Sequence, residues 1–177
     1  MTPMPFRITR PLRLLPLALI ALMLAAGGAS AQTPQLLGQD RDWGAYSVDV
    51  DGGKTCYVLS RPKDQSPKNV RRDPVYFFIT SRPKDNIRNQ VSVIIGYPFR
   101  DGGRATVEIG SAKFTLFTRD DKAWIEDLEE QDKLVAAMKG GSTMLVRGTS
   151  QRGTNTSDRY SLLGITAALE RIVKACS

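Results

Sequence analysis

The chain has 177 residues, of which 25 are basic and 18 acidic, and it contains no histidine. The lack of histidine excludes Ser-His-Asp and Cys-His catalytic groups and the usual zinc sites, so that only carboxylate, lysine or serine chemistry remains. The length suits one domain with a substantial core and is small for two.

The first 31 residues predict a secretory signal peptide. Arg7, Arg10 and Arg13 form a positive n-region, residues 14–26 are apolar, and Ala29-Ser30-Ala31 matches an A-x-A cleavage site. The apolar stretch is too short to span a bilayer, which takes about 20 residues. Removing residues 1–31 leaves 22 basic and 18 acidic residues, a net charge of +4. We expect a periplasmic protein, with outer-membrane association or secretion left open, no transmembrane segment after processing and no nucleic-acid partner.

The mature chain is expected to begin with a flexible lead at 32–41, followed by a single domain at 42–177. Regular structure is predicted from about Trp43, where apolar residues begin to alternate with period two. Glycine-rich turns separate most of the expected strands. These strands are 43–50, 54–59, 75–80, 91–97, 105–109 and 113–118.

A short repeat links two of these strands. The sequence Ser-Arg-Pro-Lys-Asp occurs at 60–64 and again at 81–85, each time directly after an apolar strand. Because proline cannot donate to a sheet ladder, both copies are interpreted as strand exits, with a duplicated basic binding motif as the alternative.

The pattern then changes to helical spacing. Residues 127–138 predict a short amphipathic helix in which Glu129 pairs with Lys133. A strand at 143–149, a polar loop at 151–157 and a brief strand at 159–162 follow. A terminal helix after Gly164 carries the apolar stripe Ile165, Ala168, Leu169, Ile172 and Val173. The predicted fold is all-β dominated, a mostly antiparallel β-sandwich or open barrel, with two short helices, one of them C-terminal.

The two cysteines, Cys56 and Cys176, are predicted to form a disulfide, because an exported chain meets an oxidising compartment. Closing so long a loop would stabilise the fold by about 4–5 kcal/mol in the chain-entropy model. A redox pair is the alternative, but the chain has no C-x-x-C motif.

The acidic run at 120–132 is the only candidate for catalysis. It could supply a carboxylate pair or a site for a hard cation, but acidic residues that open a helix are favoured by the helix dipole alone. We therefore expect no catalytic residues, no cofactor and no metal. Trp43 and Trp124 are interpreted as core residues, with ligand-stacking platforms as the alternative.

Basic residues in the loops supply the candidate binding surface. Exposed charges of this kind attract partners of opposite charge, and they remain hydrated on the surface. The residues are Arg61, Lys63, Arg71, Arg72, Arg147, Arg152 and Arg159.

Several segments together resemble a known family. They are Asp42-Trp43-Gly44, residues 91–99 (VSVIIGYPF), residues 105–110 (ATVEIG), Ala123-Trp124-Ile125 with the following helix, and Tyr160-Ser161-Leu162 with Gly164 before Ala168-Leu169 and Cys176. In order and spacing they are similar to the invasion-associated locus B (IalB) family. The resemblance implies a secreted, β-rich bacterial envelope domain, linked to host-cell invasion in some members, without established catalytic residues.

The sequence thus predicts a non-enzymatic envelope protein with a role in host interaction or envelope support. Its expected partner is an envelope or host protein, or an anionic surface glycan. Two alternatives remain: a histidine-free hydrolase that uses the carboxylates at 120–132, and a small-ligand carrier with a cavity between the sheets.

Overall fold

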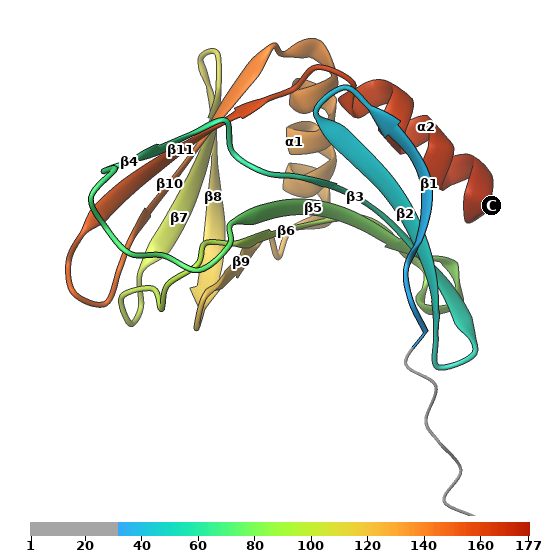
Figure 1. Ribbon diagram of the computed structural model, residues 1–177, viewed down its shortest axis with the longest axis horizontal. Coiled ribbons are helices and arrows are strands. Elements are labelled where there is room, and N and C mark those ends of the chain that lie inside the picture. Colours follow the sequence, from blue (N-terminus) through green and yellow to red (C-terminus); the bar gives the residue numbers. More distant parts are fainter. Residues whose placement is uncertain (1–31) are drawn as a thin grey trace, which may run out of the picture. The chain divides into compact units, whose positions relative to one another are not determined.

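Residues 32–177 form one continuous antiparallel sheet and two helices in the computed structural model, which describes this part of the chain. The predicted signal peptide at 1–31 lies outside the described residues. Within 32–177 the sheet has eleven strands in the order β1-β2-β3-β5-β6-β9-β8-β7-β10-β11-β4 (Figure 1). The strands are β1 Gln35–Asp40, β2 Trp43–Val50, β3 Gly53–Ser60, β4 Asp64–Ser66, β5 Tyr76–Arg82, β6 Ile87–Ile94, β7 Arg104–Ile109, β8 Ala112–Arg119, β9 Lys122–Trp124, β10 Thr143–Thr149 and β11 Asn155–Ser161.

The sheet has an inner face and an outer face, because successive side chains of a strand point to opposite sides. Val58, Phe77 and Val91 point inward from β3, β5 and β6 and are fully buried. The sheet curls so that distant strands meet across the core: the rings of Phe77 on β5 and Tyr160 on β11 lie 5.8 Å apart. The strands β1 and β4 stay apart as its two edges. The predicted all-β, antiparallel fold with two helices is confirmed, in the form of an open, curled sheet.

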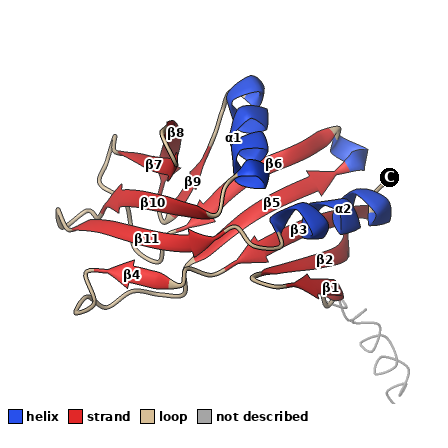
Figure 2. Ribbon diagram, turned by 90° about the horizontal axis from the view of Figure 1, so that it is seen from above, coloured by secondary structure: helices blue, strands red, loops and turns tan. Residues whose placement is uncertain are grey.

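Both helices pack against the inner face (Figure 2). Helix α1, Leu128–Gly140, lies against β6 and β8, and its Gln131 side chain accepts a hydrogen bond from the Val91 backbone N–H at 3.1 Å. Helix α2, Ile165–Ala175, covers β1, β2 and β3. Four of the five residues of its predicted stripe are buried, whereas Val173 is 61% exposed, at the edge of that stripe.

The start of α2 depends on a glycine. Gly164 has φ 94°, and a Cβ atom there would lie 1.9 Å from the Asp40 carbonyl oxygen. The backbone of β1 therefore passes so close that no other residue fits.

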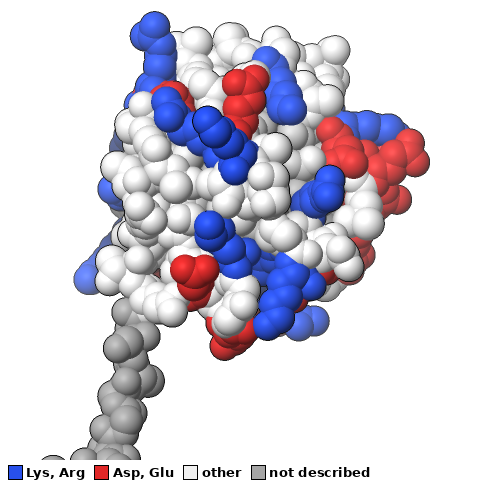
Figure 3. All heavy atoms as spheres, turned by 90° about the vertical axis from the view of Figure 1, so that its right-hand side faces the viewer, with Lys and Arg blue, Asp and Glu red and all other residues white. Residues whose placement is uncertain are grey.

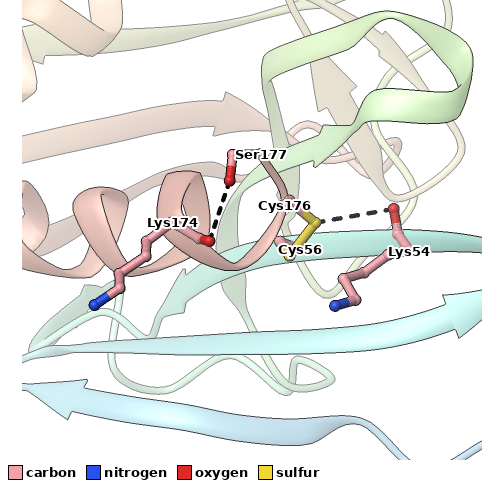
Figure 4. Close-up of a disulfide and its surroundings, with 5 residues drawn as sticks. All are labelled: Lys54, Cys56, Lys174, Cys176 and Ser177. Atoms are coloured by element: carbon pink, nitrogen blue, oxygen red, sulfur yellow. Dashed lines mark hydrogen bonds between the residues drawn. A yellow bond between two sulfur atoms is a disulfide. The ribbon is translucent and has the colours of Figure 1, made fainter.

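The predicted disulfide between Cys56 and Cys176 is confirmed (Figure 4). Cys56 is buried on the inner face of β3, and Cys176 directly follows α2. The bond joins positions 120 residues apart, and it holds the last turn of α2 on the sheet.

Strands β1, β4 and β9 were not predicted from the sequence, and β11 begins earlier than predicted. Regular structure begins at Gln35, inside the lead that was expected to be flexible, because β1 pairs with β2 and Asp40 forms an ion pair with Arg171 of α2. The strands β4 and β9 have only three residues each, too few to show a period. Strand β11 begins at Asn155, within the predicted polar loop, because its inward residues Thr156 and Asp158 are polar and hide the alternation.

None of the helices in residues 32–177 is long and apolar enough to cross a membrane. The limits of the predicted domain, 42–177, remain a prediction.

Candidate binding cleft

A cleft of about 410 Å³ lies at one end of the curled sheet. Three segments line it: the loop before β5, the loop after β6, and the turn between β10 and β11. No acidic residue is among its lining residues, which are Asn69, Val70, Arg71, Arg72, Tyr97, Pro98, Ser150, Gln151, Arg152, Thr154 and Thr156.

Arg72, one of the lining residues, belongs to a buried ion pair with Asp158, which we call the floor of the cleft. The Arg72 guanidinium donates to both carboxylate oxygens of Asp158, at 2.7 and 2.6 Å, and to the Ile95 carbonyl oxygen at 2.7 Å. The side chains of Arg72 and Asp158 are 6% and 0% exposed. The planar guanidinium suits this bidentate contact and fixes the loop before β5 to β11.

Tyr97 extends the floor toward solvent. Its ring lies under the Arg72 guanidinium, with 5.0 Å from the guanidinium carbon to the ring centroid. Its hydroxyl forms a 2.6 Å hydrogen bond with the Thr156 hydroxyl. Burial raises the pKa of Tyr97, so its hydroxyl stays protonated at neutral pH.

Burial also controls the acid of the floor. It raises the pKa of Asp158 above its ordinary value of 3.8, although the Arg72 guanidinium acts in the opposite direction. Next to it on the inner face, burial raises the pKa of Tyr160. The Tyr160 hydroxyl is buried and has no hydrogen-bond partner within residues 32–177. The Arg72–Asp158 pair is thus structural, because each of its charges is already balanced by the other.

Two arginines at the rim of the cleft carry positive charge that is not used in an ion pair within residues 32–177. Arg71 and Arg152 are exposed, and neither forms an ion pair with another described residue. The turn that holds Arg152 is well ordered by hydrogen bonds: Gln151 donates its backbone N–H to the Pro98 carbonyl at 2.9 Å, and Gly153 donates to the Ser150 carbonyl at 2.8 Å. The two guanidinium groups can therefore hold an anion over neutral hydroxyl and amide groups.

The seven basic residues predicted as a binding surface do not lie together. Arg71 and Arg152 line the cleft. Arg72 does too, but its guanidinium is buried, so the expectation that it is an exposed binding residue is corrected. The other four lie elsewhere: Arg61 over the Tyr76 ring, Lys63 paired with Asp42, Arg147 paired with Glu108, and Arg159 exposed on β11. On the face drawn in Figure 3, basic and acidic side chains are interspersed.

Most of the acidic residues at 120–132 have structural partners. Asp127 caps α1 by accepting hydrogen bonds from the backbone N–H groups of Glu129 and Glu130, at 2.8 and 3.0 Å. Lys133 pairs with both glutamates, which includes the expected pair with Glu129. Within residues 32–177 no group of three His, Cys, Asp or Glu side chains could hold a metal ion. The arrangement gives the hydrolase alternative no support.

The two tryptophans have different environments. Trp43 is fully buried in the core, as expected, and its ring N–H donates to the Ser161 carbonyl at 3.0 Å. Trp124 is half-buried on the outer face of β9, beside Phe117. A core position for Trp124 is therefore a wrong expectation.

Comparison with known proteins agrees with the resemblance that the sequence shows. The model of a family described as Invasion associated locus B (IalB) protein matches residues 43–173. No match was found among curated proteins or among solved structures. The matched segment runs from the first residue of β2 into α2, and so includes the cleft, the buried ion pair and the outer tryptophan. The chain belongs to the Invasion associated locus B family.

Proposed function

We propose that the protein is an exported, non-enzymatic envelope protein that binds an anionic group of an envelope or host partner in the cleft between Arg71 and Arg152. Membership of the IalB family suggests an invasion-associated envelope protein. The disulfide is consistent with a location outside the cytoplasm.

The composition of the cleft carries the proposal. Its two exposed guanidinium groups have no acidic neighbour among the lining residues, while Ser150, Thr154 and Thr156 add hydroxyl groups. Such a set can bind a carboxylate or a phosphate through charge-assisted hydrogen bonds, and no nucleophile and base are paired within it. Binding without chemistry is the function that this arrangement supports best.

Titration with small anions tests the site directly. N-acetylglutamate and inorganic phosphate serve as the two probes, and amide chemical shifts report binding. We expect saturable shifts at Gly153 and Thr154, and a loss of affinity of about tenfold or more in Arg71→Gln/Arg152→Gln, because each charge-assisted hydrogen bond contributes about 1.5–3 kcal/mol. Arg147→Gln/Arg159→Gln is the matched control, with the same charge change outside the cleft. Equal affinity in the two double variants would refute the site.

Complementation of a deletion strain tests the role in the cell. Arg71→Glu/Arg152→Glu should abolish the envelope or host-interaction phenotype in a folded protein, since exposed charges change stability by less than about 0.5 kcal/mol. Neutralising Asp120, Asp121 and Glu126 should leave the phenotype intact. The reverse pattern would instead support an enzyme that works through these carboxylates.

A further inference from the structure

The outer face of the sheet carries a continuous row of side chains that runs across five strands. Each residue of the row is the direct cross-strand partner of the next, from β5 through β6, β9 and β8 to β7. The row consists of Phe78, Ser92, Trp124, Phe117 and Arg104. Three of these five residues are aromatic, although they come from parts of the chain up to 46 positions apart.

Further aromatic residues continue the row toward β2. The Phe78 and Tyr57 rings lie 6.0 Å apart, and Tyr57 stacks on Tyr46 at 5.3 Å. At the other end, the rings of Trp124 and Phe117 lie 5.3 Å apart. All of these rings are half-buried, and both helices pack on the opposite face of the sheet. Half-buried rings that cluster on an open face of a sheet can serve as a binding platform.

A second row, rich in basic residues, runs beside the aromatic one. The cross-strand partners Ile94, Lys122 and Arg119 lie one step along the strands from Ser92, Trp124 and Phe117. Arg61 and Arg104 lie over the rings of Tyr76 and Phe117, at 5.4 and 5.1 Å from the ring centroids. Within this row Lys122 has an acidic neighbour, Asp121, at 3.7 Å. Positive charge therefore flanks the aromatic residues along one side and at one end.

A shallow groove of about 270 Å³ crosses the aromatic row at Phe78 and Ser92 and reaches Ile94 and Lys122 of the second row. Hydroxyl groups are placed among its rings, since Ser92 lies directly between Phe78 and Trp124 in the aromatic row. The groove is lined by Thr55, Tyr57, Phe78, Thr80, Ser92, Val93, Ile94 and Lys122. Aromatic rings, hydroxyl groups and cations are thus presented together on one surface.

From this pattern we infer that the outer face binds a linear acidic polysaccharide that lies across the strands. The C–H faces of sugar rings pack on aromatic side chains, sugar hydroxyls pair with Ser and Thr, and carboxylates pair with Arg and Lys. Neighbouring strands are about 4.8 Å apart, close to the length of one sugar residue in an extended chain. The site is separate from the cleft between Arg71 and Arg152 and does not depend on it.

Binding of hexagalacturonate to the intact mature chain tests this inference. Trp124 fluorescence and amide chemical shifts of β5, β6, β8 and β9 should both change on titration. We expect Arg119→Gln/Lys122→Gln to weaken binding about tenfold or more, because it removes two partners of the carboxylates. Trp124→Thr should weaken binding to a similar degree and keep a residue that favours strands. Arg147→Gln/Arg159→Gln, on the same outer face but outside both rows, is the matched control and should change the affinity less than about twofold.

Three other outcomes would overturn the inference. If neutral cellohexaose binds as tightly as hexagalacturonate, the basic row has no part in recognition. If single-stranded hexathymidylate binds more tightly than the polysaccharide, the face recognises nucleic acid. Absence of hexagalacturonate binding, or equal binding by all variants, would leave the aromatic row a purely structural feature. Since the neutralised variant alters only exposed charges, it stays informative if Trp124→Thr fails to fold.

Discussion

Two of the long-range attachments in the curled sheet, one in each half, differ in chemistry. In the half formed by β1, β2 and β3, the Cys56–Cys176 disulfide fixes α2 to the inner face. In the other half, the Arg72–Asp158 ion pair fixes the loop before β5 to β11. The first joins positions 120 residues apart and the second positions 86 apart. One attachment is sensitive to reduction and the other to charge, so each can be broken without the other.

Loss of the disulfide is expected to have the largest effect. Cys56→Ser and Cys176→Ser should each lower the free energy of unfolding by about 4 kcal/mol, because either change opens the same loop in the unfolded chain. Urea unfolding under non-reducing conditions gives the values. Reduction of the wild-type protein should lower its stability by the same amount and leave both variants unchanged. Clearly unequal losses in the two variants would show that one cysteine contributes mainly through packing.

Breaking the ion pair from one side should cost about 3–4 kcal/mol. Arg72→Met leaves the Asp158 carboxylate buried without its partner. An unpaired buried charge destabilises the folded state more than a buried pair does. Arg72→Met/Asp158→Leu should recover most of the loss, since it removes both charges together. Urea unfolding of the single and double variants measures the coupling.

Arg71→Met is the matched control for this prediction. The neighbouring arginine is exposed at the cleft rim, so its replacement should change the stability by less than about 0.5 kcal/mol. A loss in Arg71→Met as large as in Arg72→Met would contradict the assignment of these two residues to rim and floor.

The two attachments also differ in how far the sequence predicts them. Two cysteines have one possible intramolecular pairing, and the predicted export favours it, so the disulfide follows from the sequence. Arg72 belongs to a basic loop and Asp158 to a polar segment, and neither carries a local signal that it is buried. The sequence therefore predicts Arg72 as a surface residue, and only the curling of the sheet brings it to Asp158.

The same limit applies to the strands and to the outer face. Period two identifies β3 and β5 because their inward residues are mostly apolar, and β2 because Tyr46, Val48 and Val50 alternate on its outer face. The polar inward residues of β11 hide its first half. Arg71 and Arg152 were among the predicted binding residues, but their meeting at one cleft depends on tertiary structure. The row through Phe78, Trp124 and Phe117 depends on the register between strands, which a single sequence does not specify.

Tyr160 offers a smaller test of the ion-pair half. Its hydroxyl is buried without a partner in the described residues, close enough to Asp158 for that acid to help raise the Tyr160 pKa. Tyr160→Phe should therefore keep the stability or raise it by about 1 kcal/mol, because an unsatisfied buried hydroxyl is removed and the ring is kept. Thermal unfolding measures the change. A loss of more than about 1 kcal/mol would mean that the hydroxyl contributes a hydrogen bond in solution.

The smallest expected effect lies in the disulfide half and depends on pH. Asp40 on β1 accepts hydrogen bonds from Arg171 of α2 at 2.6 and 3.0 Å, and these bonds lower the pKa of Asp40 below 3.8. The folded protein therefore binds this proton less readily than the unfolded chain, so the contribution of Asp40 is present above pH 3.8 and is lost as the pH falls through the folded-state pKa.

Replacing this aspartate removes that contribution. Asp40→Asn should lower the stability at neutral pH by less than about 1 kcal/mol, as for other exposed ion pairs. The difference from the wild type should vanish in acid. Asp158 has the opposite sign, because its raised pKa makes its contribution fall as the pH rises from 3.8 toward the folded-state value. Urea unfolding over this range measures both. If the Asp40→Asn difference persists unchanged in acid, the contact between β1 and α2 is held by packing rather than by charge.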